Sequence, residues 1–183
     1  MAMIDKVKAF VESECRKPES KYGYEPFVFH FTPVVRYAET LSDELGGDKE
    51  AIIIAAWLHD IGSIVYGRED HHITGARIAE EFLKQHDYPK VELVTRCILN
   101  HRGSKDNDRH SIEEKIVAEA DVLSAFESLP GLFKAAYHEG LTQEEARESV
   151  RQKLINKWRQ LHFERSREII RPKYEAAMLL LKQ

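Results

Sequence analysis

Histidine and aspartate residues occupy several places in this sequence where an apolar residue is expected. Residues 51–58 are apolar on every side, which is typical of a helix buried in the middle of a domain, yet they run directly into His59 and Asp60. Further along the chain, Asp121 falls on the apolar face of a helical segment. Such polar groups avoid burial unless something pairs with them, so a compensating partner is expected beside them.

Further histidines extend this set toward metal-binding chemistry. His101 ends the inward face of a helical segment, His30 precedes an apolar stripe, and His71 and His72 stand at the start of a helix. A single histidine of this kind is more often a core residue that bonds a carbonyl than a ligand, but the joint pattern is much more specific. Imidazole and carboxylate ligands together suit a divalent ion such as Mn, Fe, Co, Ni, Zn or Mg. The absence of cysteine from the set argues against a structural zinc site.

The elements that must position these residues are helices almost throughout, which predicts an all-α fold. Apolar residues recur at the helical period, and only residues 24–31 (YEPFVFHF) can be argued as a strand. Thr32 before a proline and Asp48 are both expected to cap helices. Gly62 is expected to end the buried helix, and a long C-terminal helix that starts near residue 142 is expected to break before Pro172.

Length and composition predict one soluble globular domain. The chain has 183 residues, of which 43% are hydrophobic and 32% charged, with no repeat and no low-complexity segment. We expect a single domain over residues 1–183, in which residues 30–126 carry the motifs and residues 131–183 form additional helices. The sequence contains no indication of the oligomeric state.

Charge and cysteine content narrow the classes of partner and compartment. The formal net charge of −4 offers no basic patch for a nucleic acid, so no nucleic-acid partner is expected. The two cysteines are too few for a disulfide framework, and the longest apolar run is too short to span a membrane. The N-terminal residues lack the apolar region of a signal peptide. A cytoplasmic protein without a membrane partner is therefore expected.

Together these residues resemble the HD superfamily of metal-dependent phosphohydrolases, whose motif is H…HD…D on an all-helical core. The motif maps onto His30, His59, Asp60 and Asp121. The segments HDIG at residues 59–62 and ADVLSAFE at residues 120–127 are similar to the local signatures of the family, and so are HHITGA (71–76) and ILNH (98–101). The resemblance covers roughly residues 30–126, whereas the C-terminal helices carry no motif.

The resemblance implies roles for the motif residues. One divalent ion would be held by His30, His59, Asp60 and Asp121, and either Asp60 or a metal-bound hydroxide would serve as the base. Members with extra histidines hold a second ion or grip phosphate with them, which implies such a role for His101 and for His71 or His72. The cofactor is therefore expected to be one divalent ion, or two.

The implied reaction is hydrolysis of a small phosphorylated compound, most naturally a nucleotide, by a metal-activated water. Cations near the pocket would bind the phosphate; Arg102 and Lys105 are the first candidates, with Arg36 and Arg68 behind them. Arg102 and Lys105 lie in a polar stretch, residues 102–111, which is expected to be an exposed and mobile loop beside the pocket mouth.

Two alternatives to hydrolysis stay open. A branch of the family that uses two irons as an oxygenase shares the same ligands, and a nucleotide-binding sensor would keep the pocket without turnover. The cyclic-dinucleotide phosphodiesterase branch carries a Gly-Tyr-Pro motif, and residues 100–108 (NHRGSKDND) stand in its place, so that activity is not supported.

Overall fold

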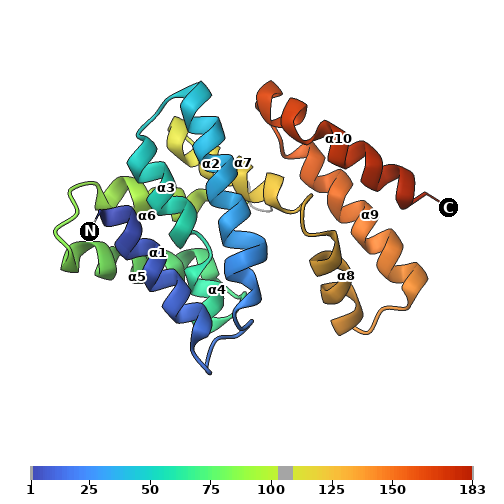
Figure 1. Ribbon diagram of the computed structural model, residues 1–183, viewed down its shortest axis with the longest axis horizontal. Coiled ribbons are helices and arrows are strands. Elements are labelled where there is room, and N and C mark those ends of the chain that lie inside the picture. Colours follow the sequence, from blue (N-terminus) through green and yellow to red (C-terminus); the bar gives the residue numbers. More distant parts are fainter. Residues whose placement is uncertain (1, 103–108, 183) are drawn as a thin grey trace. The chain divides into compact units, whose positions relative to one another are not determined.

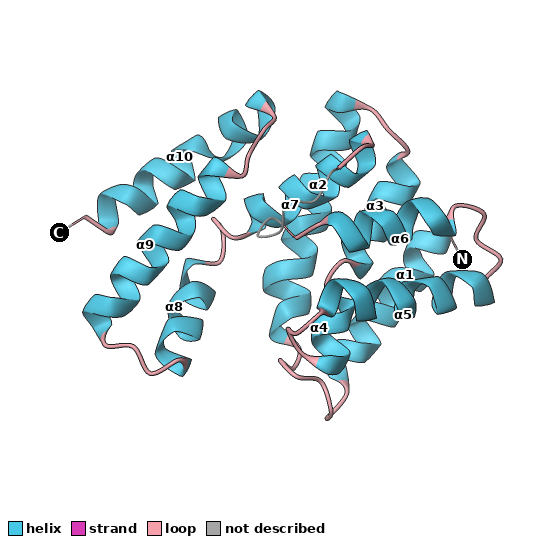
Figure 2. Ribbon diagram, turned by 180° about the vertical axis from the view of Figure 1, so that it is seen from behind, coloured by secondary structure: helices cyan, strands magenta, loops and turns pink. Residues whose placement is uncertain are grey.

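The computed structural model describes residues 2–102 and 109–182 (Figure 1). These described residues form helices and no strand, which confirms the all-α prediction (Figure 2). The chain divides into two compact units, Met1–Asp121 and Val122–Gln183, and each is described here by itself. Whether the chain behaves as the single domain expected from its length stays a prediction.

The first unit contains most of the helices. In chain order they are α1 (Met3–Arg16), the π-helix η1 (Phe27–Phe31), α2 (Thr32–Leu45), α3 (Lys49–Leu58), α4 (Ile61–Tyr66), α5 (His71–Gln85), α6 (Val91–Asn100) and α7 (Ile112–Ser124), whose last residues pass into the second unit. The second unit contains α8 (Leu129–His138), α9 (Gln143–Arg159) and α10 (Glu164–Leu180).

Helix α3 forms the centre of the first unit. Residues 51–58 are all buried, and the helix packs against α1, α2 and α6, as an all-round apolar helix must. Its start is capped as expected, because the Asp48 side chain accepts a hydrogen bond of 3.1 Å from the backbone N–H of Ala51. The helix ends at Leu58, so His59 and Asp60 follow directly from the core.

The membrane expectation can be compared with helix length and hydropathy. Among the described residues, no single helix is long and apolar enough to cross a membrane. Lys49–Tyr66 and His71–Gln85 pass that test only as a pair bent by 113°.

Residues 24–31, the only candidate for a strand, are helical instead. Phe27–Phe31 form a π-turn in which both the backbone N–H and the hydroxyl of Thr32 donate to the Phe27 carbonyl, the hydroxyl at 2.9 Å. Pro33 lacks an N–H, so an α-type bond is missing beside this turn. Thr32 therefore continues the helical path from η1 into α2, and its side chain does not cap the helix.

Gly62 does not end a helix as predicted but lies inside α4, where that helix crosses the start of α5. A Cβ atom at Gly62 would lie 2.2 Å from the His71 carbonyl oxygen and 2.6 Å from the backbone nitrogen of Gly75. Glycine therefore serves close helix packing here. Helix α4 ends at Gly67, which has the positive φ of 99° that favours glycine.

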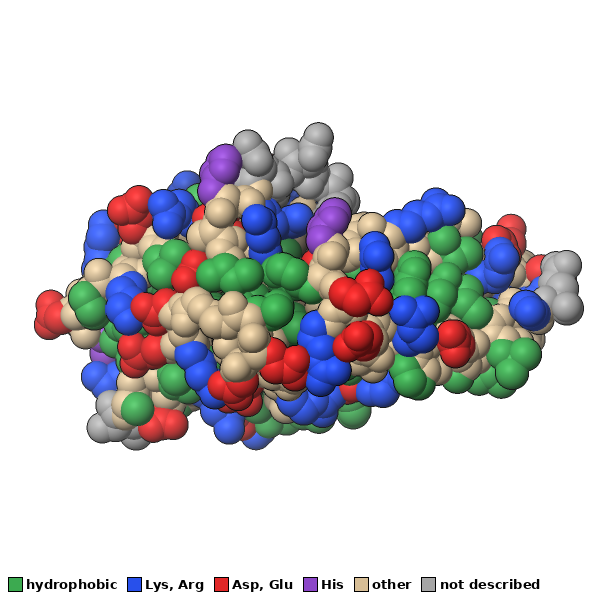
Figure 3. Space-filling model, turned by 90° about the horizontal axis from the view of Figure 1, so that it is seen from above, with side chains coloured by type: hydrophobic (Ala, Val, Ile, Leu, Met, Phe, Trp, Pro, Cys, Tyr) green, Lys and Arg blue, Asp and Glu red, His purple; other side chains and the backbone are tan. Residues whose placement is uncertain are grey.

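The C-terminal helices differ from expectation at one point. The start near residue 142 is confirmed by a capping box between Thr142 and Glu145. However, the break lies between α9 and α10, at residues 160–163, and Pro172 lies within α10. Acidic and basic side chains are interspersed over the face drawn in Figure 3.

Candidate metal centre

Six side chains from five separate parts of the first unit converge on one place. They come from η1, the α3–α4 junction, the start of α5, the end of α6 and from α7. They form two groups, each able to offer three ligand atoms within 4.8 Å of one another. The groups are His30, His59 and Asp121, and Asp60, His71 and His101.

Asp60 joins the two groups because its oxygens face opposite ways. Oδ2 lies 3.3 Å from Nε2 of His30 and 3.9 Å from Nε2 of His59. Oδ1 lies 3.1 Å from Nε2 of His71 and 3.5 Å from Nε2 of His101. One carboxylate can thus bridge two adjacent positions.

Asp121 completes the first group from the opposite side. Its Oδ1 lies 3.7 Å from Nε2 of His30 and 3.9 Å from Nε2 of His59. Among these residues the ring of His59 is fully buried, whereas His30 and Asp121 are partly exposed. The group is therefore rooted in the core and open at one edge.

Backbone carbonyls orient three of the four imidazoles. Nδ1 lies 2.8 Å from the Ala56 oxygen in His59, 2.8 Å from the Arg68 oxygen in His71, and 2.6 Å from the Ile98 oxygen in His101. Since a carbonyl only accepts, each Nδ1 carries the proton, and each Nε2 lone pair is left to face the centre.

The Nε2 atoms of the four imidazoles approach one another in two close pairs. Nε2 of His30 lies 3.0 Å from Nε2 of His59, and Nε2 of His71 lies 3.3 Å from Nε2 of His101. In the His71–His101 pair both nitrogens are acceptors by the assignment above, so a cation between them would relieve the repulsion. Imidazole nitrogens and carboxylate oxygens in this arrangement fit a divalent metal.

The protonation states point the same way. Burial lowers the pKa of His59 to about 4, which keeps its ring neutral near pH 7 and able to ligate. Burial alone would raise the pKa of Asp60, but His59, His101 and His30 beside it outweigh that effect and hold the pKa well below its ordinary value. The neutral ring of His59 and the ionised carboxylate of Asp60 are both donors suited to a cation.

The pair His71 and His72 is resolved by position. His71 belongs to the second ligand group. His72 belongs to neither of the two groups found among the described residues. His72 is also buried, and its Nδ1 lies 3.4 Å from a guanidinium nitrogen of Arg102. His72 thus lies one step outward from the ligands, linked to a candidate phosphate-binding cation.

Two other candidate cations, Arg36 and Arg68, have exposed side chains. The Arg36 guanidinium lies over the Tyr37 ring at 5.3 Å, and the Arg68 carbonyl oxygen lies 2.8 Å from Nδ1 of His71. Lys105 lies outside the described residues, as does most of the predicted loop at residues 102–111.

Sequence reasoning missed two residues that support the centre. Arg109 donates to the carbonyls of Asn100, His101 and Arg102, and buried Glu114 accepts from the Asn100 amide at 3.0 Å. The backbone N–H of Glu114 also donates to the Ser111 hydroxyl at 3.2 Å, a local contact at the start of α7, but the bond of its side chain to Asn100 had no local signal. Only an arginine shortly after a helix end hinted at carbonyl capping.

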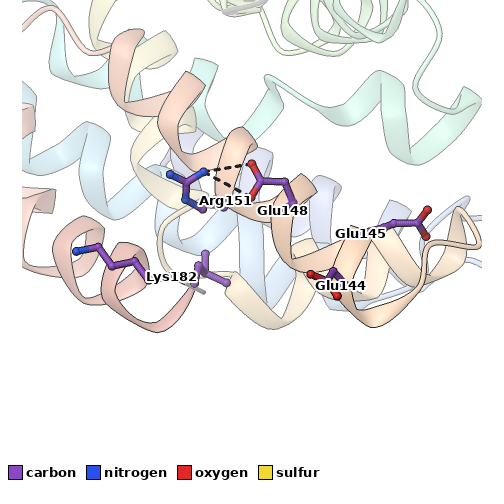
Figure 4. Close-up of a pocket in the computed structure, with 6 residues that line it drawn as sticks. Glu144, Glu145, Glu148, Arg151 and Lys182 are labelled. Carbon is purple, nitrogen blue, oxygen red and sulfur yellow. Dashed lines mark hydrogen bonds and ion pairs between the residues drawn. The ribbon is translucent and has the colours of Figure 1, made fainter.

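A surface pocket elsewhere shares nothing with this centre. It is lined by residues of the second unit alone, and Arg151 pairs with Glu148 at 3.2 Å beside it (Figure 4). None of the six converging side chains lines it.

The fold and the site together define a class: a helical protein in which histidines and aspartates from separate helices meet in two adjacent ligand groups. The family model of the HD domain matches residues 28–125, more than half of the chain. This chain belongs to the HD domain family.

The chain is also similar to a named relative and, in its fold, to solved structures. The chain is 33% identical over 117 residues to ribonuclease Y of Mycoplasma capricolum; the match covers 63% of this chain but 21% of that protein. In structure it is similar to a protein from Listeria innocua (TM-score 0.74, 19% identity, 97% of this chain and 91% of the other). It is also similar to an HD-superfamily hydrolase from Bacillus thuringiensis (TM-score 0.70, 20% identity, 97% and 91%).

Proposed function

We propose that this protein is a metal-dependent phosphohydrolase that acts on a small phosphorylated compound, a nucleotide in the first instance. The observation that carries the proposal is the convergence of imidazole Nε2 atoms around the two oxygens of Asp60. Family membership supports it, as does the hydrolase assignment of the Bacillus thuringiensis structure.

In this proposal His30, His59, Asp60 and Asp121 hold one divalent ion. His71 and His101, with the second oxygen of Asp60, hold a second ion or a phosphate oxygen. A bound divalent ion lowers the pKa of a water and polarises a phosphoryl oxygen. The low pKa of Asp60 favours its role as ligand and as hydrogen-bond acceptor for the attacking water over a role as strong base.

Phosphate binding falls to the cations beside the ligands. Arg102 is half-buried, and a nitrogen of its guanidinium lies 3.4 Å from Nδ1 of His72, the residue next to His71 at the start of α5. Lys105 stays a candidate from the sequence, and the exposed Arg36 and Arg68 would act by long-range attraction.

An RNA phosphodiester is a second substrate class that the same hydrolytic chemistry could serve. Ribonuclease Y of Mycoplasma capricolum is by name an enzyme acting on RNA, and the chain spans about a fifth of its length. We therefore include an RNA phosphodiester among the substrates to test. The predicted absence of a nucleic-acid partner stays a prediction, as does the cytoplasmic location.

A two-iron oxygenase is the second candidate function. It is favoured by the pairing of two ligand groups through one bridging carboxylate, which suits two metal ions as well as one. Iron content with substrate-dependent oxygen consumption would distinguish it.

The test begins with metal analysis of the purified chain. Phosphate release from nucleotides and fragment formation from a short oligoribonucleotide are then measured with Mn²⁺, Co²⁺, Ni²⁺ or Mg²⁺, with Asp60→Asn as the control. Turnover by the wild type, together with none by Asp60→Asn, supports hydrolysis. A metal-loaded protein that binds nucleotides without phosphate release, RNA cleavage or oxygen uptake would contradict both enzymes and favour a sensor.

A further inference from the structure

Arg109 bonds three consecutive backbone carbonyls at the end of α6. Its Nε donates to the Asn100 oxygen at 2.8 Å, and one terminal nitrogen donates to the oxygens of Arg102 at 3.1 Å and His101 at 3.4 Å. The last carbonyls of a helix have no partner within the helix, and the negative end of the helix dipole favours a cation there. Arg109 thus supplies hydrogen-bond donors and a positive charge to the last carbonyls of α6.

The residue enclosed by these bonds is His101. It is the C-cap of α6, and its ring reaches the second ligand group through Nε2 while Nδ1 bonds the Ile98 carbonyl. The last turn of a helix frays readily when its carbonyls are unpaired. Because Arg109 holds the peptide groups on both sides of His101, it limits how far the ring can move from Asp60 and His71.

Arg109 is itself held in place through its neighbour. The backbone N–H of His110 donates to Oε2 of Glu114 at 3.3 Å, and the same oxygen accepts from the Asn100 side chain at 3.0 Å. Glu114 is buried in α7, the helix that also carries Asp121. The end of α6 is therefore joined to α7 by two routes, one through Arg109 and one through Glu114.

We propose that Arg109 is a positioning residue for the second ligand group, acting through the backbone of His101. The inference rests on the proposed metal centre. It distinguishes the two groups: loss of Arg109 releases the backbone that carries His101 and so weakens binding at Asp60, His71 and His101. The group of His30, His59 and Asp121 feels Arg109 through its charge attraction to Asp121, so we expect that group to be weakened less. Lysine cannot replace it, because a single ammonium lacks the planar fork that spans successive carbonyls.

The experiment is a Co²⁺ titration of the full chain, freed of metal by chelation, followed by calorimetry. We expect the wild type to bind two ions, and His101→Ala identifies which event belongs to the second group. Arg109→Ala should weaken that event about 10- to 100-fold and the other by less than about threefold, the range found when groups that orient metal ligands are removed. Arg109→Lys should fall between.

Arg167→Ala is the matched control, since Arg167 donates to the Leu161 carbonyl at 2.7 Å in the second unit. It should leave both events unchanged. Helical content by circular dichroism is recorded for every variant; if Arg109→Ala does not fold, the comparison rests on Arg109→Lys.

Four results would overturn the inference. Unchanged Co²⁺ binding in both Arg109 variants would contradict the positioning role and leave the proposed centre standing. Equal weakening of both binding events would have the same consequence. A wild type that binds one ion removes the second site but keeps a one-ion enzyme. A wild type that binds no Co²⁺ overturns the inference and the proposed function together.

Discussion

Asp60 is the side chain on which both ligand groups depend. Its two oxygens face different histidine pairs, and Asp60→Asn replaces one oxygen by a donor and removes the negative charge. We expect the variant to lose metal and activity, by about 100-fold or more, as ligand changes exceed the 10- to 100-fold losses known for outer groups. Metal content and turnover of the purified variant give the measurement.

The fold should survive this change. Residues 52–58 are buried and apolar, and they pack without any contribution from the carboxylate. Far-UV circular dichroism of Asp60→Asn should therefore match the wild type. A variant that unfolds in the absence of metal would indicate that Asp60 serves the fold and not a metal.

Arg102 allows a separate prediction about substrate binding. If it grips phosphate in the ground state and the transition state alike, Arg102→Ala raises KM about tenfold, the effect of about 1.4 kcal/mol, and changes kcat little. Steady-state kinetics on the nucleotide found by the screen measure both constants. Arg77→Ala, which alters an exposed arginine of α5, is the control; an equal rise in KM there would contradict a specific grip.

At the scale of elements, the crossing of α4 and α5 places His71. A Cβ at Gly62 would meet backbone atoms of His71 and Gly75 at 2.2 and 2.6 Å, so Gly62→Ala must push the helices apart. We expect a loss of about 1–3 kcal/mol in the free energy of unfolding, as in other overpacked cores, with weaker metal binding at the second group. Denaturant unfolding and Co²⁺ titration measure the two effects.

Gly75→Ala is the matched control for that prediction. It lies on the facing helix, but its added Cβ would approach no atom closer than 3.3 Å, so a small shift accommodates it. Alanine also favours the helix by up to about 1 kcal/mol over glycine, and the net effect should be near zero. Equal destabilisation by both substitutions would show that the crossing is not what requires Gly62.

At the scale of the whole molecule, the reactivity of both cysteines measures how stably the unit with the candidate ligands is folded. Cys15 and Cys97 are buried in the first unit, and burial raises the pKa of each thiol, that of Cys15 to about 11. A metal ion at a free concentration of 100 times its Kd stabilises the folded state by about 2.7 kcal/mol. Chelation should therefore lower Tm and speed alkylation of both thiols, measured by mass spectrometry. In Asp60→Asn, the chelator should make little difference.

The sequence alone determined the helical class and predicted which residues are the candidate ligands. An apolar run at residues 51–58 has to be buried, and aspartate or histidine at its end needs a partner, so neither conclusion required a structure. Predictions of helix ends from local sequence were wrong where one residue type can serve two structural purposes. Gly62 can end a helix or allow close packing, and Pro172 can break a helix or be accommodated within one.

Only the tertiary structure decided how the ligands are shared. Neighbours on a helix point about 100° apart, so whether His71 or His72 faces the centre depends on how α5 is turned against α4 and α6. The bridging position of Asp60 and the hold of Arg109 on the end of α6 likewise join residues far apart in the chain. Periodicity reports which face of a helix is buried, but the rotation and spacing of that helix are set by side chains on its neighbours.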